Sequence, residues 1–135
     1  EKGRLKVPNA FRALLEATYG RALFLTSLTG EYVRIYPMAV WLEIEEKLGN
    51  VPPGLPARLR YLDRINYFGQ PGELDTQGRV LIPVRLREAA TMAGSVDVLG
   101  QLNCLDVWNH DRFLAKLKRE AYTDEDARAL AEFGL

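Results

Sequence analysis

Residues that often carry chemistry are scarce in this chain of 135 residues. Its one cysteine, Cys104, cannot form an internal disulfide and has no CxxC partner for metal or redox chemistry. Its one histidine, His110, has no cysteine, histidine or carboxylate at the spacing of metal ligands. We therefore expect it to lie at the start of a helix, without a catalytic or metal-binding role. The chain also lacks an excess of charge of either sign, because 18 basic residues balance 18 acidic ones. No overall basic field marks a nucleic-acid partner, so any such function must come from local patches.

Long apolar runs are absent as well. The longest, such as residues 22–25 and 80–83, fall far short of the roughly 20 residues needed to cross a bilayer, so no membrane segment is expected. The first residues lead into no apolar stretch, and we expect no secretory signal and a cytoplasmic protein. No phosphate-binding glycine loop and no nucleophile motif is present. The sequence therefore predicts a protein that is not an enzyme and needs no cofactor, metal or small-molecule substrate.

What the sequence does contain is an internal repeat. Residues 3–12 return as residues 78–87, with a glycine, an arginine, a proline and a second arginine in register. The apolar positions between them agree in character, and the match continues to the aromatic pair Trp41 and Phe113. The offset between the copies falls from 75 to 72 residues, so the second copy has lost about three loop residues.

Each copy has the signals of a strand, a short helix, a hairpin and a second helix. A strand at residues 5–7 ends at Pro8, and an apolar stripe then predicts a helix in each copy, closed by Gly20 and Gly94. Two hairpins follow, with strands expected at residues 23–28, 32–36, 96–99 and 105–108. The helices after the hairpins begin at Pro37 and Asp111, and their apolar residues are expected to face inward: Trp41, Ile44, Leu48, Phe113 and Leu117.

Between the copies, glycine and proline at residues 49–56 predict a linker, and residues 58–67 predict a helix. Residues 69–72 are interpreted as a turn leading into a strand at residues 73–75. A capping-box spacing at Thr123 predicts a short last helix.

The predicted fold class is α+β, with two tandem β-α-β-β-α halves. Each half alone would bury too little apolar surface to be stable, so we expect them to pack as a pseudo-symmetric pair. The halves are assigned to residues 1–50 and 71–120. A linker and helix occupy residues 51–70, and a helical tail occupies residues 121–135.

The glycine and arginine that open each copy suit a surface that reads nucleic acid. Gly3 and Gly78 can take the positive φ of a tight turn, from which the next arginine projects. Asp75 lies four residues before Arg79, where it can accept hydrogen bonds from the guanidinium group and hold it in one direction. An arginine held in this way suits bidentate contact with guanine in the major groove, which contributes roughly 1 to 3 kcal/mol of discrimination.

Local charge agrees with this hypothesis. Residues 1–21 hold five basic residues against two acidic ones, and residues 58–87 hold six against three, which leaves +3 in each segment. The compensating acids lie at residues 43–46 and in the tail at residues 120–132, so we expect both to face away from DNA. The candidate base-reading residues are Arg4 and Arg79, and the candidates for phosphate contact are Lys2, Arg12, Arg85 and Arg87.

Residues 75–83, with Arg85 and Arg87 after them, resemble the AbrB family of swapped-hairpin proteins. The doubled arrangement resembles the MraZ family over nearly the whole chain. The resemblance implies a swapped-hairpin β-barrel with flanking helices. It also ties an Asp-x-x-x-Arg element to DNA binding, which Asp75 and Arg79 match. In the first copy only Arg4 matches, because its aspartate would precede Glu1.

The MraZ resemblance further implies a bacterial transcriptional regulator. Such a protein represses the promoter of the division and cell-wall gene cluster by binding direct repeats in double-stranded DNA. It also implies a ring-shaped homo-oligomer associated with the nucleoid.

Other interpretations stay open at this stage. The Gly-Arg turns could be ordinary turns with solvated arginines, and Asp75 and Arg79 could form an ordinary surface ion pair worth about 0 to 1 kcal/mol. The aromatic residues are expected to pack in the core rather than to stack on bases. The chain could also be an AbrB-superfamily antitoxin that binds a toxin protein and its own operator, or a purely structural module. Two copies and a short tail favour the regulator over the antitoxin.

Overall fold

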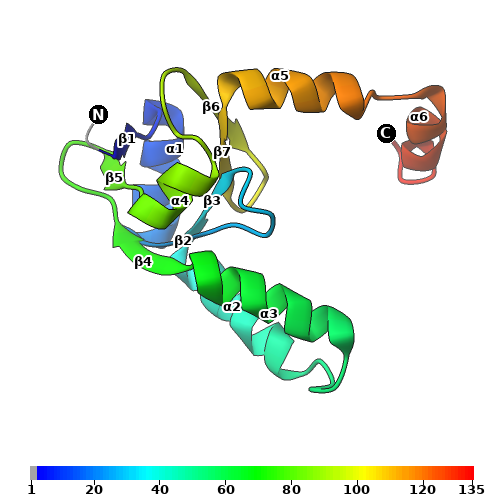
Figure 1. The fold of residues 1–135 in the computed structure, drawn as a ribbon, viewed down its shortest axis with the longest axis horizontal. Coiled ribbons are helices and arrows are strands. Elements are labelled where there is room, and N and C mark those ends of the chain that lie inside the picture. Colours follow the sequence, from blue (N-terminus) through cyan, green and yellow to red (C-terminus); the bar gives the residue numbers. More distant parts are fainter. Residues whose placement is uncertain (1–2) are drawn as a thin grey trace.

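The structure is a computed structural model that describes residues 3–135, and its fold is α+β (Figure 1). Lys2 lies outside the described residues. The strands of residues 3–135 form two antiparallel sheets. One is a two-stranded ribbon of β1 (Arg4–Lys6) and β5 (Arg79–Leu81). The other has the order β4-β2-β3-β7-β6, with bounds Gln70–Glu73, Ala22–Thr26, Val33–Pro37, Leu105–Asn109 and Val96–Gly100.

The two copies of the repeat are joined by strand pairing. Both predicted hairpins form, as β2 with β3 and β6 with β7. Segments from different copies then pair at three places: β1 with β5, β2 with β4, and β3 with β7. The predicted α+β class is confirmed. The strands of residues 3–135 do not close into a barrel, so the predicted swapped-hairpin barrel is not confirmed.

In two of these pairs a residue faces its own counterpart in the other copy. Leu5 lies opposite Val80, 75 residues further along the chain. Arg34 lies opposite Asp106, 72 residues further along. Two antiparallel strands related by a two-fold axis place equivalent residues opposite each other where the axis passes. The register in both pairs is therefore the one that a pseudo-two-fold pair requires.

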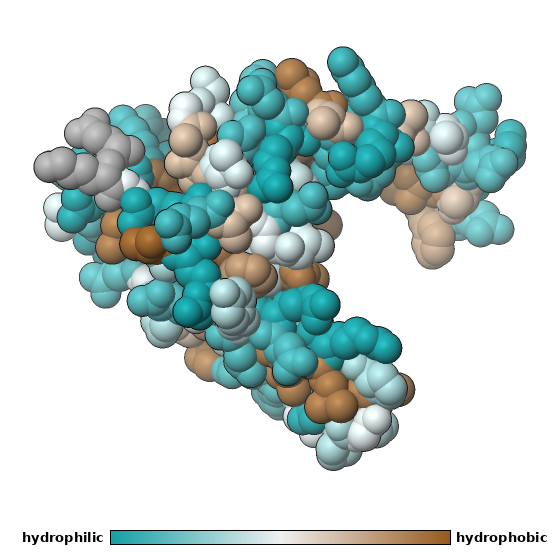
Figure 2. Space-filling view, viewed as in Figure 1, coloured by the Kyte–Doolittle hydropathy of each residue, from teal (hydrophilic) through white to brown (hydrophobic). Residues whose placement is uncertain are grey.

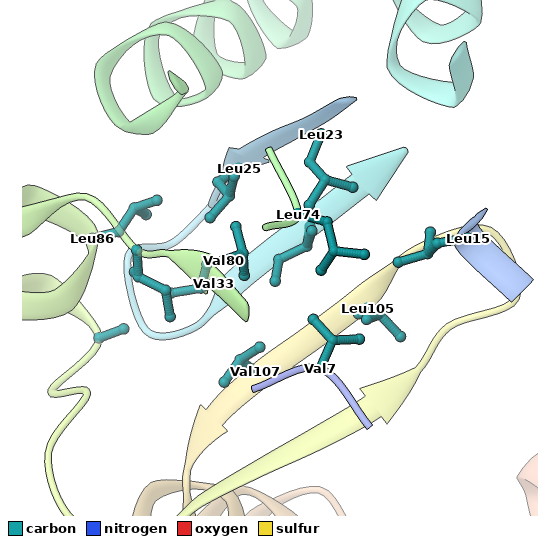
Figure 3. Close-up of a cluster of buried hydrophobic side chains, with 13 residues drawn as sticks. Val7, Leu15, Leu23, Leu25, Val33, Leu74, Val80, Leu86, Leu105 and Val107 are labelled. Atoms are coloured by element: carbon teal, nitrogen blue, oxygen red, sulfur yellow. The ribbon is translucent and has the colours of Figure 1, made fainter. Parts of the chain in front are cut away.

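The core lies where the two copies meet (Figure 3). It contains fully buried residues from both, among them Val7, Leu25 and Val33 from the first and Val80 and Val107 from the second. Each buried side chain of this size stabilises the fold by about 1.5 to 3 kcal/mol relative to its exposed form. Because neither copy encloses this cluster alone, most of that stabilisation depends on the pairing of the copies.

An ion pair with a buried carboxylate lies at one of the two positions where equivalent residues face each other. Arg34 Nε and Nη2 donate to Asp106 Oδ1 and Oδ2 over 2.8 and 3.0 Å, and Asp106 is only 5% exposed. The hydrogen bonds to Asp106 raise the pKa of Arg34, so the guanidinium stays charged. A buried carboxylate needs such a partner, because an unpaired charge in the interior is strongly destabilising.

The helices that follow the two hairpins have different surroundings. The first, α2 (Met38–Gly49), forms a helical hairpin with α3 (Pro56–Phe68) that projects from the sheet (Figure 1). Trp41 of α2 is 5% exposed and stacks on Phe24 with 4.4 Å between ring centroids, so its predicted core position is confirmed. In α3, Ile65 is the buried residue, and Leu59 is half exposed.

In the second copy, α5 (His110–Arg119) leads to α6 (Asp124–Ala131), and both extend away from the sheet (Figure 1). The predicted inward position of Leu117 is wrong, because α5 packs near its start on β6 and β7 and Leu117 lies beyond them, 53% exposed. Asn109 caps α5, and His110 Nδ1 lies 2.9 Å from Asp97 Oδ2. The predicted capping box at Thr123 is confirmed.

The short helices after the two prolines end differently from each other. Helix α1 (Asn9–Leu14) continues into a π-helical turn, η1 (Leu15–Tyr19), which Gly20 closes with φ of 86° as predicted. Helix α4 (Val84–Ala89) ends well before Gly94, so that prediction is wrong. Thr91 takes the left-handed conformation at φ of 54° and ends the helix there.

The segment before the second Gly-Arg turn also differs from the prediction. Residues 70–73 form the strand β4, where the sequence predicted a turn, and the turn comes later, at residues 75–78. The glycines and the proline of residues 69–72 are typical of a turn, which is why the sequence predicted one there. β4 is an edge strand, and a proline on an edge can be tolerated because one side of the strand needs no N–H donor.

No helix within residues 3–135 combines the length and the apolar character that a membrane span requires. Figure 2 shows hydrophobic surface in several places on this face, including the α2–α3 hairpin and the C-terminal segment. The exposed apolar residues there include Leu42, Leu55, Tyr122, Phe133 and Leu135.

Candidate nucleic-acid interface

The ribbon of β1 and β5 brings the two predicted base-reading arginines to one surface. Lys6 lies opposite Arg79, and Arg4 lies opposite Leu81. Directly opposed residues of an antiparallel pair point to the same face, and alternate residues of one strand share a face. Arg4, Lys6, Arg79 and Leu81 therefore point outward together, while Val80 on the other face is 1% exposed. Figure 1 places this ribbon at the end of the molecule opposite the α2–α3 hairpin.

Asp75 organises the turn that leads into β5. Its Oδ1 accepts hydrogen bonds from the backbone amides of Gln77 and Arg79, at 2.8 and 2.9 Å. Its own amide donates to the Arg79 carbonyl over 2.8 Å, and the Gly78 amide donates to the Asp75 carbonyl over 3.1 Å. Gly78 has φ of 76°, the left-handed conformation that glycine adopts without strain. The aspartate thus fixes the backbone from which Arg79 projects.

The Arg79 side chain is held by groups of the same turn. Its Nε lies 3.6 Å from Asp75 Oδ2, and its Nη2 donates to Gln77 Oε1. The pKa of the Asp75 carboxyl is lowered, first by the hydrogen bond from the Arg79 amide and further by the Gln77 amide and the charges of Arg79 and Arg4. The carboxylate is therefore charged at neutral pH and favours the cationic cluster around it.

Each Gly-Arg turn is covered by an arginine from the other copy. A Cβ atom at Gly78 would lie 2.8 Å from Cδ of Arg12, and a Cβ atom at Gly3 would lie 2.6 Å from Cζ of Arg87. The backbone bonds around the turns are reciprocal as well, because the Val7 amide donates to the Gly78 carbonyl and the Ile82 amide to the Gly3 carbonyl, over 2.9 and 2.7 Å. Each turn is thus stabilised in part by contacts from the other copy.

These contacts use some of the donors of Arg12 and Arg87. Arg12 Nη2 donates to the Thr76 carbonyl over 3.0 Å and its Nε to Glu16 over 3.0 Å. Arg87 Nε donates to the Ile82 carbonyl over 2.8 Å. A guanidinium group has five N–H donors, so both arginines can hold the turns and still offer donors outward.

Comparisons with known proteins show the family of this chain. A family model described as "MraZ protein, putative antitoxin-like" matches residues 70–133. A protein named transcriptional regulator MraZ from Acidobacterium capsulatum is 46% identical over 135 residues, which cover all of this chain and 92% of that protein. Proteins of the same name from Koribacter versatilis and Chromobacterium violaceum are 40% and 32% identical, over 100% and 83% of this chain and 92% and 76% of theirs. This chain belongs to the MraZ family.

Among the other candidate residues of this MraZ family member, Arg85 lies beside the ribbon. Its guanidinium group stacks 4.3 Å from the centroid of the Tyr67 ring, and its Nη1 donates to the Tyr67 carbonyl over 3.0 Å. Within residues 3–135 the structure brings Arg4, Asp75, Arg79, Arg12 and Arg87 together around the ribbon, with Arg85 at its side.

Sequence reasoning missed two residues on the ribbon face, Lys6 and Leu81. The alternation of the first strand, which places Lys6 two residues after Arg4, was the signal that could have found Lys6. Its counterpart Leu81 was counted only as part of an apolar run. The aromatic residues Tyr36 and Trp108 are each 6% exposed, so core packing is confirmed for them. In the part of the chain that the structure describes, no cluster of histidine, cysteine and carboxylate residues could hold a metal ion.

Proposed function

We propose that this protein is a sequence-specific DNA-binding transcriptional regulator that uses the outer face of the β1–β5 ribbon. The observation that carries the proposal is the pairing of the two Gly-Arg turns, which places Arg4, Lys6 and Arg79 on one exposed face. The major groove of B-DNA is about 12 Å wide and admits a two-stranded ribbon. The names of the relatives, transcriptional regulator MraZ, support the same proposal.

In this proposal, residues on the ribbon divide into two roles. Arg4 and Arg79 contact base edges, and Asp75 keeps the second turn in the shape that directs Arg79 outward. Lys2, Arg12, Arg85 and Arg87 contact phosphates and fix the register on the duplex without reading sequence. The acidic residues of α2 and of the tail belong to elements that project away from the ribbon, so they do not oppose the approach of DNA (Figure 1).

The finer biological role rests on the MraZ resemblance. We propose that the protein represses the promoter of the division and cell-wall gene cluster by binding direct repeats, in the cytoplasm and in association with the nucleoid. A ring-shaped homo-oligomer would present several ribbons to consecutive repeats and would gain avidity from them. Binding alone accounts for this role, so the proposal includes no catalysis and no cofactor.

The experiment that tests the proposal measures binding of the purified chain to its own upstream DNA and to a scrambled duplex at fixed salt. The variant removes both reading arginines, Arg4→Ala with Arg79→Ala. The matched control removes the same charge from helices away from the ribbon, Arg60→Ala with Arg128→Ala. Each lost bidentate contact with guanine costs about 1 to 3 kcal/mol, so the first variant loses its preference for the upstream duplex.

We expect the control to keep that preference, with unchanged circular dichroism for both variants. A contact with about four to six phosphates gives a log-log slope of affinity against salt near −4 to −5. Equal, weak binding of the wild-type protein to both duplexes would contradict the proposal. It would favour the antitoxin or structural interpretation, in which the partner is a protein.

A further inference from the structure

The outer face of the ribbon differs in chemistry between its two strands. Lys6 in the first copy and Leu81 in the second occupy equivalent positions, 75 residues apart. Lys6 offers a cation, whereas Leu81 leaves 53% of its surface exposed. Contacts to phosphate need hydrogen-bond donors or positive charge, which leucine lacks. An exposed leucine between arginines is therefore not explained by binding to the DNA backbone.

The apolar character extends beyond Leu81 in the second copy. Val84 at the start of α4 is 57% exposed, and its counterpart in the first copy is Asn9. Leu81, Pro83 and Val84 line one groove, which Arg85 and Arg87 also border. The second half of the ribbon thus presents the exposed apolar residues Leu81 and Val84 beside two arginines, where the first half has Lys6 and Asn9.

We propose that Leu81 is a base-reading residue that packs against the C5 methyl group of a thymine in the major groove. This inference rests on the proposed function. The thymine methyl is the apolar group that base pairs present in the major groove, and aliphatic side chains recognise it by contact. Arg4 lies directly across the ribbon from Leu81, so the leucine approaches duplex DNA whenever the arginines do.

The geometry of β5 sets where that thymine lies. Arg79 and Leu81 are two residues apart on one strand, which separates them by about 6.8 Å. Base pairs of B-DNA rise about 3.4 Å per step, so this distance corresponds to about two steps. The thymine contacted by Leu81 therefore lies about two base steps from the guanine contacted by Arg79.

A consequence is that the two halves of the ribbon prefer different bases. Lys6 donates to guanine or phosphate where Leu81 selects a thymine methyl. A binding site that suits both halves is therefore not palindromic, although the ribbon is nearly two-fold symmetric. The protein then binds each copy of its site in one orientation.

The test begins with duplexes that the full chain selects from a random pool. In a selected site, each thymine is replaced in turn by deoxyuridine, which removes the methyl group and leaves the hydrogen-bonding edge unchanged. We expect this replacement to weaken binding at one thymine. That thymine lies about two base steps from the guanine whose recognition is lost in Arg79→Ala. We expect binding there to weaken about fourfold, the effect of burying one methyl-sized group.

Two variants locate the effect. Leu81→Ala binds the thymine and deoxyuridine duplexes equally, whereas Lys6→Ala, the matched control on the other strand, keeps the methyl dependence. Both side chains are exposed, so unchanged thermal unfolding midpoints confirm that the fold is intact. The inference is overturned if the wild-type protein prefers its selected site but no thymine shows methyl dependence, or if Leu81→Ala keeps it. Failure to select any site would instead overturn the proposed function, and this inference with it.

Discussion

The two copies of the repeat agree closely at their Gly-Arg turns and differ where their hairpins meet. At the ribbon, both glycines have positive φ, and each is covered by an arginine from the other copy. At the β3–β7 pair, the equivalent positions hold Arg34 in one copy and Asp106 in the other. Two identical chains would place like charges opposite each other there, which is destabilising. Because both halves belong to one chain, each could acquire the charge that complements its counterpart.

A second difference concerns the helices after the hairpins. α3 packs beside α2 in the first half, whereas α5 in the second half leads out to an exposed tail (Figure 1). Trp41 is buried, while its counterpart Phe113 is only partly buried. The same repeat position is therefore fully or only partly buried according to which segment follows it in the chain.

The largest loss of stability is expected when Arg34 and Asp106 are replaced by two residues of the same charge. Asp106→Arg gives both copies an arginine at this position and leaves Arg34 without its carboxylate. Breaking a fully buried ion pair costs roughly 3 to 5 kcal/mol, and because Arg34 is partly exposed we expect a loss near the lower end, about 3 kcal/mol. Urea denaturation of the purified protein measures this loss.

The control exchanges the two charges, Arg34→Asp together with Asp106→Arg. This double variant restores the opposite charges in the same strand register and recovers more than half of the lost stability. If Asp106→Arg alone lowered the stability by less than about 1 kcal/mol, the typical value for an exposed pair, the copies would not depend on this difference.

A smaller effect is expected where the copies agree. Gly3→Ala and Gly78→Ala each introduce a side chain at positive φ and displace a covering arginine, so we expect each to cost about 2 to 3 kcal/mol. Gly94→Ala is the matched control, because Gly94 has φ of 70° but nothing within 4 Å of an added Cβ. It should cost about 1 kcal/mol from backbone strain alone. Unequal losses at Gly3 and Gly78 in thermal unfolding would show that the turns are not equivalent.

The smallest effect concerns the protonation of Asp75. Its pKa is lowered below the ordinary value of 3.8, so its contribution to the turn is complete above that value and is lost as the pH falls through the lower, folded pKa. The turn should therefore not change between pH 5 and pH 8. A carboxyl-carbon NMR titration measures this pKa directly.

The Arg79→Ala variant separates the causes of this shift. The amide of an alanine at position 79 still donates to Asp75, so most of the lowering should remain after the guanidinium is lost. A return of the pKa to 3.8 in this variant would show that the side chain, and not the backbone, holds the carboxylate.

Much of the fold was predictable because the repeat supplies each signal twice. The hairpins, the helix α3 and the capping box at Thr123 follow from local rules, and the structure has them within one or two residues of the expected bounds for the hairpins and α3. The wrong predictions concern residues whose structure depends on their position in the folded protein rather than on the local sequence. Pro71 is tolerated only because β4 lies at a sheet edge, and Leu117 is exposed because α5 extends past the sheet. Neither fact is contained in the local sequence.

For the candidate site, the sequence was enough to select Arg4, Arg79 and Asp75 as candidates, but not to show their shared surface. The 75-residue offset indicates that the turns are equivalent, whereas only the register of β1 with β5 shows that they share one face. Asp75 was expected to bind the guanidinium group, yet its shorter contacts are to backbone amides. Arg34 and Asp106 gave no signal, because 72 residues separate two positions that differ in charge.

The covering of each turn by an arginine of the opposite copy makes the two halves of the binding surface depend on each other. The second turn closes its own hydrogen bonds through Asp75, but each glycine is covered by an arginine of the other half, so a molecule in which one half has come apart loses the cover on the turn that remains. Under the proposed function, such a molecule has no complete reading surface, because Arg4 and Arg79 no longer share one face. We therefore expect local damage in either half to abolish specific binding rather than to halve it.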